Sequence, residues 1–229
     1  MFNENYYKYH PILINMIEYV DIVTEFIDKP KTVLEIGSLH GNDANELMNL
    51  IGTTENNIHV IEANPEFYKK IKIKYPKFNV YNFAATNING FVDFNAIDTT
   101  IKQNFGISSL LDRNDNRKYN KIKINAKRMD NFLVDNKIES IDICKIDVEG
   151  NIMETLLGFG DSIKTIKSFH IEAEHKLIWE NQKLFSDVEK YLILNKFKPI
   201  SLKFAGFQSD SIWVKNDLIK RNWWGKYKN

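Results

Sequence analysis

Apolar positions recur at helical spacing near the start of the chain. Over residues 11–28 they fall at Leu13, Met16, Ile17, Val20, Val23 and Ile27. Acidic residues at positions 18, 21, 25 and 28 interrupt this run, so it is too polar for a membrane-spanning segment. We therefore predict an amphipathic surface helix over residues 11–28, which ends before Pro30.

From residue 32 the pattern changes to short apolar runs that alternate with amphipathic stretches. The short runs predict strands over residues 32–36, 58–61, 78–83, 141–147 and 168–173, with weaker strands over 91–94 and 122–124. The amphipathic stretches predict helices over residues 42–51, 64–74, 130–136, 152–157 and 182–195. The last two runs, 198–204 and 211–214, predict a closing pair of strands. Strands that alternate with helices are typical of a largely parallel sheet.

Turn residues predict where several of these helices begin and end. Asn64 suits the N-cap of its helix, with Pro65 in the first helical position, and Gly52 suits the end of the helix before it. Asp130 suits the N-cap of a later helix. No repeat or linker-like stretch divides the chain. We therefore predict an N-terminal helical extension over residues 1–30 and one α/β domain over residues 31–229.

The composition is that of an ordinary globular protein. Hydrophobic residues make up 43% and charged residues 27% of the sequence, which excludes wholesale disorder. The formal net charge of +1 gives no electrostatic reason to expect binding to nucleic acid or to an anionic membrane. We therefore predict that the aromatic and basic C-terminal tail, with Trp223, Trp224 and Tyr227, packs or forms an interface.

Cysteine usage and the N-terminus indicate a cellular compartment. Cys144 is the only cysteine, which excludes an internal disulfide and a metal site with several cysteines. The first ten residues lack the basic and apolar regions of a secretory signal. We therefore expect a protein of the reducing cytoplasm.

A glycine-containing loop follows the first predicted strand. Glu35, Gly37 and Gly41 form the pattern E-x-G-x-x-x-G. The dinucleotide fingerprint G-x-G-x-x-G is absent, because Leu39 stands two positions after Gly37, and no phosphate-binding G-K-[ST] occurs. The loop therefore suits an adenosyl ligand without a phosphate. Glu62 ends the second predicted strand 25 residues after Gly37, where an acidic residue can bind both ribose hydroxyls.

Longer stretches of the sequence resemble the FkbM family of S-adenosylmethionine-dependent methyltransferases. The residues that carry this resemblance are VLEIGSLHGND, VIEANPEFYKKI, GISSLL, KRMDNFL and ICKIDVEGNIMETLLG, within residues 32–158. The most specific of them is KIDVEG, at residues 145–150, and the family's closing strand is matched by QSDSIWV near residues 208–214. The resemblance implies a Rossmann-like α/β fold: a seven-strand, mostly parallel sheet with helices on both faces and an antiparallel last strand.

The resemblance also implies a cofactor, S-adenosyl-L-methionine, and a set of residues that bind it. The predicted cofactor-binding residues are Glu35, Gly37, Ser38, Gly41, Asn42, Glu62, Ala63, Asn64, Phe83, Ala84, Ala85, Ser109 and Asp147. In the family pattern the glycine loop lies at the methionine end, Glu62 at the ribose and residues 83–85 at the adenine. The acidic residue that other methyltransferases of this class use at the adenine is absent here.

Two charged residues share one face of the strand predicted over residues 141–147. Lys145 and Asp147 are two positions apart, and an unpaired lysine would be costly to bury in so apolar a strand. The two residues either form a buried ion pair that fixes the strand end, or act in catalysis. In the catalytic interpretation Asp147 lies under the transferable methyl group and Lys145 orients the acceptor oxygen. Both interpretations stay open.

A hydroxyl acceptor must lose its proton to a base during methyl transfer. Glu149 lies in the turn before the next helix, where it is either this base or a carboxylate that stabilises the helix N-terminus. Glu172 and His175, at the end of the strand predicted over residues 168–173, are further candidates for catalytic residues. Asp147, Glu149 and His175 also offer ligands for a divalent cation. No paired ligand spacing supports such a site, so we predict that no metal is required.

The resemblance also implies O-methylation, so we predict an O-methyltransferase that acts on a hydroxyl of a sugar, a glycan or a related small molecule. Alternatives are a nitrogen acceptor, although the chain lacks an N/D-P-P-Y/F motif, and a non-catalytic cofactor-binding scaffold. The intact glycine loop and the D-V-E-G turn count against a scaffold, and the glycine spacing counts against a nicotinamide-dependent oxidoreductase. The acceptor's identity and the oligomeric state stay open.

Overall fold

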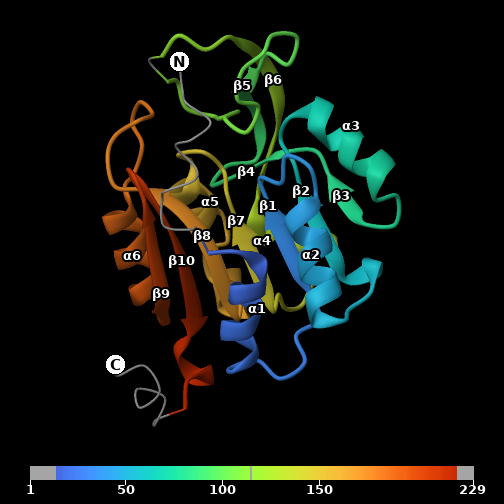
Figure 1. The fold of residues 1–229 in the computed structure, drawn as a ribbon, viewed down its shortest axis with the longest axis vertical. Coiled ribbons are helices and arrows are strands. Elements are labelled where there is room, and N and C mark those ends of the chain that lie inside the picture. Colours follow the sequence, from blue (N-terminus) through green and yellow to red (C-terminus); the bar gives the residue numbers. More distant parts are fainter. Residues whose placement is uncertain (1–13, 114, 221–229) are drawn as a thin grey trace.

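A seven-stranded sheet forms the centre of the computed structural model, which describes residues 14–113 and 115–220 (Figure 1). The strand order is β3-β2-β1-β7-β8-β10-β9. The bounds of these strands are β1 Val33–Ile36, β2 Ile58–Ile61, β3 Asn79–Tyr81, β7 Ile143–Ile146, β8 Ser168–Glu174, β9 Phe197–Ala205 and β10 Gln208–Lys215. Neighbouring strands from β3 to β8 run parallel, whereas β10 is antiparallel to both β8 and β9. This arrangement confirms the predicted fold class.

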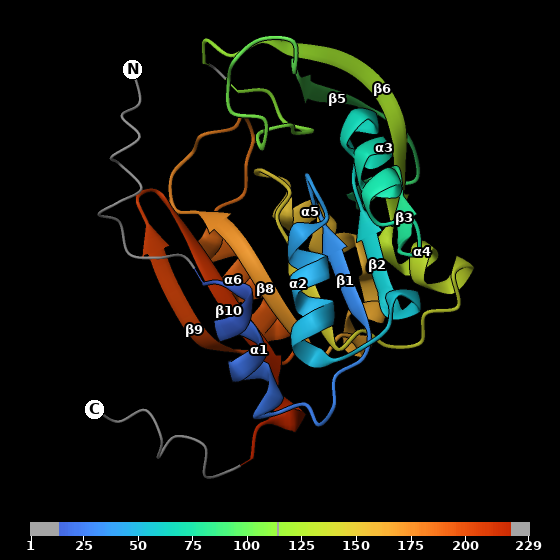
Figure 2. The same cartoon turned by 45° about the vertical axis from the view of Figure 1, so that its right-hand side comes forward.

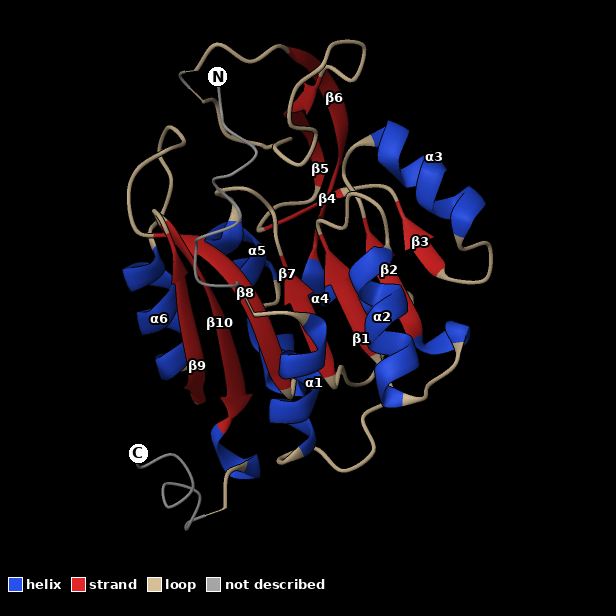
Figure 3. Cartoon of the chain, in the orientation of Figure 1, coloured by secondary structure: helices blue, strands red, loops and turns tan. Residues whose placement is uncertain are grey.

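Helices cover both faces of the sheet (Figures 2 and 3). Their bounds are α1 Met16–Thr24, α2 Asn42–Ile51, α3 Pro65–Lys74, α4 Met129–Asp135, α5 Ile152–Gly158 and α6 Phe185–Leu194, with short 3-10 turns at Glu55–Asn57, Gly160–Thr165 and Asn216–Leu218. One apolar core lies between the sheet and α4, α5 and α6, and a second lies between the sheet and α1, α2 and α3. These two cores fix the sheet so that the loops after its parallel strands meet at one edge.

Helix α1 packs on the sheet through the side chains predicted to form its apolar face. Tyr19 and Val23 are completely buried, in the same core as Val33 and Ile143. The helix ends at Thr24, earlier than predicted, and turns precede Pro30. Residues 11–13 of the predicted helix lie outside the described residues, as does the tail with Trp223, Trp224 and Tyr227. The division of the chain at residue 30 stays a prediction.

A second, three-stranded sheet stands above the carboxyl ends of β1 and β2 (Figures 1 and 2). Its order is β4-β6-β5, with bounds β4 Ala84–Thr86, β5 Gly90–Ile97 and β6 Tyr119–Arg128. The sequence predicts only short pieces of β5 and β6 and misses β4. The reason is that much of the sheet faces outward: Phe91 is 68% exposed, so apolar runs are short and mixed with lysine and asparagine.

The observed helix ends can be compared with the capping residues predicted from the sequence. Gly52 ends α2 with a φ of 67°, and the Asn64 side chain accepts a hydrogen bond from the Glu66 amide at the start of α3, so both predictions are confirmed. The predicted cap at Asp130 is wrong. Helix α4 begins one residue earlier with Arg128 as N-cap, and the Asp130 carboxylate instead accepts from the Arg128 guanidinium. No helix among residues 14–113 and 115–220 is long and apolar enough to cross a membrane.

Candidate active site

A cavity of about 270 Å³ opens at the carboxyl ends of β1, β2 and β7, under the small sheet. The predicted cofactor residues that line it are Gly37, Ser38, Asn42, Glu62, Ala63, Phe83, Ala84, Ala85, Ser109 and Asp147. Lys145 and Glu149 line it as well. The structure therefore brings together the glycine loop, the second-strand acid and the D-V-E-G turn.

The loop after β1 is shaped by close contact with the neighbouring strand end. Gly37 has a φ of 78°, and a Cβ atom at this position would lie 1.7 Å from the backbone oxygen of Asp147. Only glycine fits there, because a side chain would displace the end of β7. Gly41 also has a positive φ, and its amide donates to the Ser38 hydroxyl at 2.9 Å. Gly41 does not line the cavity but shapes the turn that does.

Glu62 joins the ends of β1 and β2. Its carboxylate accepts hydrogen bonds from the amides of Ser38, at 3.2 Å, Leu39, at 2.8 Å, and Asn64, at 2.7 Å. A carboxylate has about four acceptor sites, so about one remains for a ligand hydroxyl. Burial raises the pKa of Glu62, and the three amides oppose that shift because they favour the charged form.

Two predicted cofactor residues stand behind the cavity wall. The buried Glu35 carboxylate accepts a hydrogen bond from the Ala44 amide at 3.1 Å, in the first turn of α2. Burial raises its pKa to about 8, against the nearby charge of Lys145. Asn64 caps α3 and donates to the Ser108 hydroxyl at 3.3 Å. Both residues therefore hold the loops that line the cavity.

Lys145 and Asp147 form the ion pair that their spacing predicts. Their Nζ and Oδ2 atoms lie 3.2 Å apart, and Asp43 of α2 approaches the same ammonium group at 3.1 Å. Burial alone would lower the pKa of Lys145, but the carboxylates of Asp147, Asp43 and Glu35 together raise it. Lys145 therefore stays charged and holds Asp147 at the strand end.

Glu149 follows in a strained turn. Its φ of 48° is left-handed, and its backbone oxygen accepts a 2.6 Å hydrogen bond from the Ser109 hydroxyl. Burial, and then the neighbouring charge of Asp147, raise the pKa of Glu149 well above its ordinary value. Helix α5 begins three residues later, with Asn151 as its N-cap, so Glu149 lies outside the capping positions.

The remaining predicted catalytic residues, Glu172 and His175, lie on different sides of β8. Carboxylate oxygens of Asp147, Glu149 and Glu172 come within 4.8 Å of one another, in a part of the chain that the structure describes. His175 instead lies on the opposite side of β8, where its Nε2 atom is 2.8 Å from the Ser209 hydroxyl and its ring packs on Phe185. The set considered from the sequence, with His175 as a ligand, is therefore not the one that the structure assembles.

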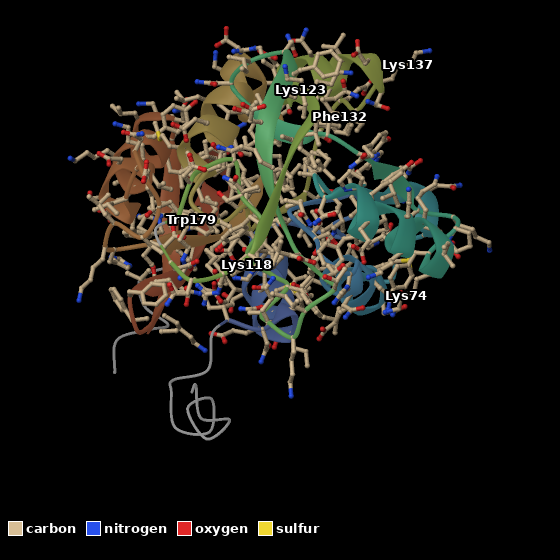
Figure 4. The ribbon with its side chains drawn as sticks, turned by 90° about the horizontal axis from the view of Figure 1, so that it is seen from above. Lys74, Lys118, Lys123, Phe132, Lys137 and Trp179 are labelled. Carbon is tan, nitrogen blue, oxygen red and sulfur yellow. The ribbon has the colours of Figure 1, made fainter. Side chains whose placement is uncertain are left out.

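Loops from two other parts of the chain cover the Glu149 turn. The Arg113 guanidinium lies 4.9 Å from the Trp179 ring centroid, and their backbones form an isolated bridge. The view from above shows Trp179 beside the loop between β5 and β6 (Figure 4). A Cβ atom at Gly150 would meet the Trp179 indole at 2.5 Å, so glycine is needed under this cover.

Sequence reasoning missed several lining residues. The cavity also contains Leu39, His40, Asp43, Phe67, Phe94, Phe105, Gly106, Leu110, Val148 and Asn151. Residues 94 and 105–110 come from the small sheet and its loop, which carry no local motif except the G-I-S-S-L-L run. Asp43 could have been found from its place two residues after Gly41, at the start of a predicted helix.

The residues of this cavity fit an adenosyl cofactor that carries a sulfonium. Phe83, Ala84 and Phe94 give apolar contact for a base, and Glu62 keeps an acceptor site for a ribose hydroxyl. Asp147, Glu149 and Asp43 place carboxylates where a positive charge is favoured. No lysine or arginine other than the ion-paired Lys145 lines the described cavity, which suits a ligand without phosphate groups.

Comparison with known proteins gives the family. The chain matches the family model of the methyltransferase FkbM domain over residues 30–208. No curated protein was found to match in sequence. Among solved structures, methyltransferase FkbM from Methylobacillus flagellatus KT aligns with a TM-score of 0.58 and 11% identity, over 92% of this chain and 50% of that one.

A second solved structure, the methyltransferase domain of METTL16, aligns with a TM-score of 0.52 and 9% identity, over 90% of this chain and 69% of that one. At these identities the two likenesses concern the fold, and this chain spans half the length of the M. flagellatus protein. The family match covers more than half of this chain. The chain therefore belongs to the FkbM family of S-adenosylmethionine-dependent methyltransferases.

Proposed function

We propose that this chain transfers a methyl group from S-adenosylmethionine to a hydroxyl group of a sugar, a glycan or a related small molecule. The observation that carries the proposal is the place of the Glu149 carboxylate. It lines the first cavity, and its oxygens approach those of Asp147 and Glu172 within 4.8 Å. A carboxylate in this place is suited to take the proton of an acceptor hydroxyl.

The chain's own residues would bind and align the two substrates. The loop from Gly37 to Gly41 and the carboxylate of Glu62, both at the first cavity, would hold the cofactor, with residues 83–85 against its adenine. When bound, S-adenosylmethionine supplies a methyl group already activated by its sulfonium, so the protein mainly provides alignment and a proton acceptor. Lys145 keeps Asp147 in place through their ion pair.

In this proposal Glu149 is the general base. The acceptor's O–H bond breaks as its oxygen gains the methyl group, and the proton moves to a Glu149 carboxylate oxygen. Burial and the charge of Asp147 raise the pKa of Glu149, which makes its carboxylate a stronger base than an exposed glutamate. The charges of Arg113 and Arg117 oppose this shift of the pKa.

The remaining features support a small-molecule acceptor. A net charge of +1 gives no electrostatic reason to expect a nucleic acid, so we propose that none is bound. A single buried cysteine agrees with a reducing cytoplasmic location, which we propose as well.

The test uses S-adenosylmethionine labelled with ¹³C in its methyl group. The protein is incubated with pools of sugars, glycans and small alcohols, and formation of S-adenosylhomocysteine is followed by mass spectrometry. We expect a product whose labelled carbon has the ¹³C NMR shift of a methyl ether. A labelled N-methyl product would move the activity to a nitrogen acceptor. Cofactor binding without any methylated product in the pools would favour a non-catalytic scaffold.

A further inference from the structure

A second cavity, also of about 270 Å³, lies next to the first on the side of α1. The two cavities share Asp43, Lys145 and Asp147. The other walls of the second cavity come from the start of α1 and from the facing side of β8 and β10. A molecule in this space would therefore touch the carboxylate of Asp147 from the side that a cofactor in the first cavity leaves open.

The second cavity has an excess of carboxylates. Glu172 of β8 and Asp210 of β10 are direct partners in the antiparallel register, and Asp210 is 4% exposed. The ammonium group of Lys145 is already shared between Asp43 and Asp147. Within residues 14–113 and 115–220, no lysine or arginine lies within ion-pair distance of Glu172 or Asp210.

The pKa of Glu172 is shifted in the direction that an excess of carboxylates predicts. Burial, followed by the charges of Asp147 and Asp210, raises it well above its ordinary value. A positive charge in the cavity would relieve this repulsion and favour the ionised carboxylates. The cavity therefore lacks a positive charge that would balance its carboxylates.

His170 provides an independent sign of a missing polar partner. Its side chain is 3% exposed and lines this cavity, yet neither ring nitrogen makes a hydrogen bond. Its Nε2 atom lies 3.5 Å from the Asp210 carboxylate, and its ring leans on that of Tyr19. Buried polar atoms are rarely left without partners, because the loss of hydration is costly. A hydroxyl or amino group in the cavity would supply the partner.

We propose that the second cavity binds the methyl acceptor, and that this acceptor carries a protonated amino group among its hydroxyls, as amino sugars do. The inference rests on the proposed function and names its substrate class. The ammonium group would donate to Asp210 and Glu172, and a neighbouring hydroxyl would bond His170. An acceptor with a phosphate or carboxylate at this end would be repelled by the same carboxylates.

The test compares two probes that differ in one substituent, methyl glucosaminide and methyl glucoside. Binding of each to the protein saturated with S-adenosylhomocysteine is measured by saturation-transfer NMR at millimolar concentration. We expect the amino sugar to bind about tenfold tighter or more, as charge-assisted hydrogen bonds predict. The preference should vanish in Asp210→Asn, which keeps an oxygen for the Ile14 amide that Asp210 accepts from at 3.0 Å.

Two further variants make the test specific. Glu172→Gln should reduce the preference as well. Asp161→Asn, which removes one charge from a side chain that is 95% exposed, should keep it in full. S-adenosylhomocysteine affinity of Asp210→Asn, measured by calorimetry, should match that of the unmodified chain, because Asp210 lies outside the first cavity. A cooperative thermal melt shows that the variant is folded.

Equal binding of the two probes would overturn the inference, as would no binding of the amino sugar or a preference that survives in both Asp210→Asn and Glu172→Gln. These are binding measurements, so they are separate from methyl transfer. An amino-sugar preference without any methylated product would contradict the proposed function and leave this inference standing. Methyl transfer without the amino-sugar preference would support the proposed function and contradict this inference.

Discussion

The Ser109 hydroxyl donates a 2.6 Å hydrogen bond to the backbone oxygen of Glu149. Ser109 is 1% exposed and follows β5 of the small sheet, whereas Glu149 follows β7 of the large sheet. This bond therefore ties the cover of the site to the turn that carries the proposed base. Glu149 has a left-handed φ of 48°, which a glutamate adopts only where its surroundings hold it.

Ser109→Ala should therefore act through Glu149. We expect loss of about 1–3 kcal/mol of stability for a buried hydrogen bond, and a methyl transfer about tenfold slower at saturating cofactor. Ser108→Ala is the matched control, because Ser108 binds the Asn64 side chain and the Ile97 amide but not Glu149. Single-turnover methylation of both variants is the measurement. Equal losses of rate would show that the loop as a whole, and not the bond to Glu149, matters.

Gly37→Ala should destroy cofactor binding. The added Cβ atom would lie 1.7 Å from the Asp147 backbone oxygen, so the end of β7 must move. Gly52→Ala is the control: it has a similar φ of 67° but no atom within 4 Å of the added Cβ, so it should cost only about 1–2 kcal/mol of backbone strain. Thermal melts and calorimetry with S-adenosylhomocysteine measure both effects. Retained affinity in Gly37→Ala would refute the close-contact explanation.

Glu149→Gln should separate chemistry from binding. We expect methyl transfer to slow by about 10²–10⁴-fold while cofactor affinity and fold are kept. The pH dependence should change too. Because the pKa of Glu149 is raised, its proton is lost only at higher pH, and the rate should rise with pH through a value above 4.5, the ordinary pKa of glutamate.

This rising limb belongs to the carboxylate cluster as a whole, because Asp147 and Glu172 influence Glu149. It should be absent or displaced in Glu149→Gln. A near-normal rate with an unchanged pH profile would transfer the role of base to Glu172 or remove the need for a side-chain base.

Exhaustive chelation tests whether a metal takes part. We predict that product formation survives EDTA, since a carboxylate base suffices for an acceptor hydroxyl. The structure shows which ligands a metal would use instead: carboxylate oxygens of Asp147, Glu149 and Glu172 lie within 4.8 Å of one another. Activity that is lost with EDTA and restored by magnesium would assign this cluster to a metal ion.

Local signals explain how much of the fold could be predicted. The ends of α2 and α3 follow from Gly52 and Asn64, whose side-chain or backbone chemistry acts within a few residues. Strand β2 has the predicted bounds because it is a short, almost wholly buried apolar run. Strand β4 has no such signal: Ala84–Thr86 is a strand only because β6, more than thirty residues later, pairs with it.

The same distinction holds for the site. The ion pair of Lys145 and Asp147 could be predicted from a spacing of two in one strand, but the approach of Asp43 depends on how α2 packs on the sheet. Glu172 and His175 are close in sequence, yet the alternation of strand faces separates them. Asp210 and His170 belong to the second cavity through the register of β10 with β8, which no local pattern in the chain specifies.

Calorimetric titration with S-adenosylhomocysteine tests the central claim most directly, with NAD⁺ as the competing ligand class. We predict one S-adenosylhomocysteine bound per chain and no heat with NAD⁺. Affinity should fall about ten- to a hundredfold in Glu62→Gln, because a charge-assisted hydrogen bond to the ribose is lost. It should stay unchanged in Glu66→Gln, which alters a glutamate whose side chain is 46% exposed. No binding of S-adenosylhomocysteine, or full affinity in Glu62→Gln, would contradict the account.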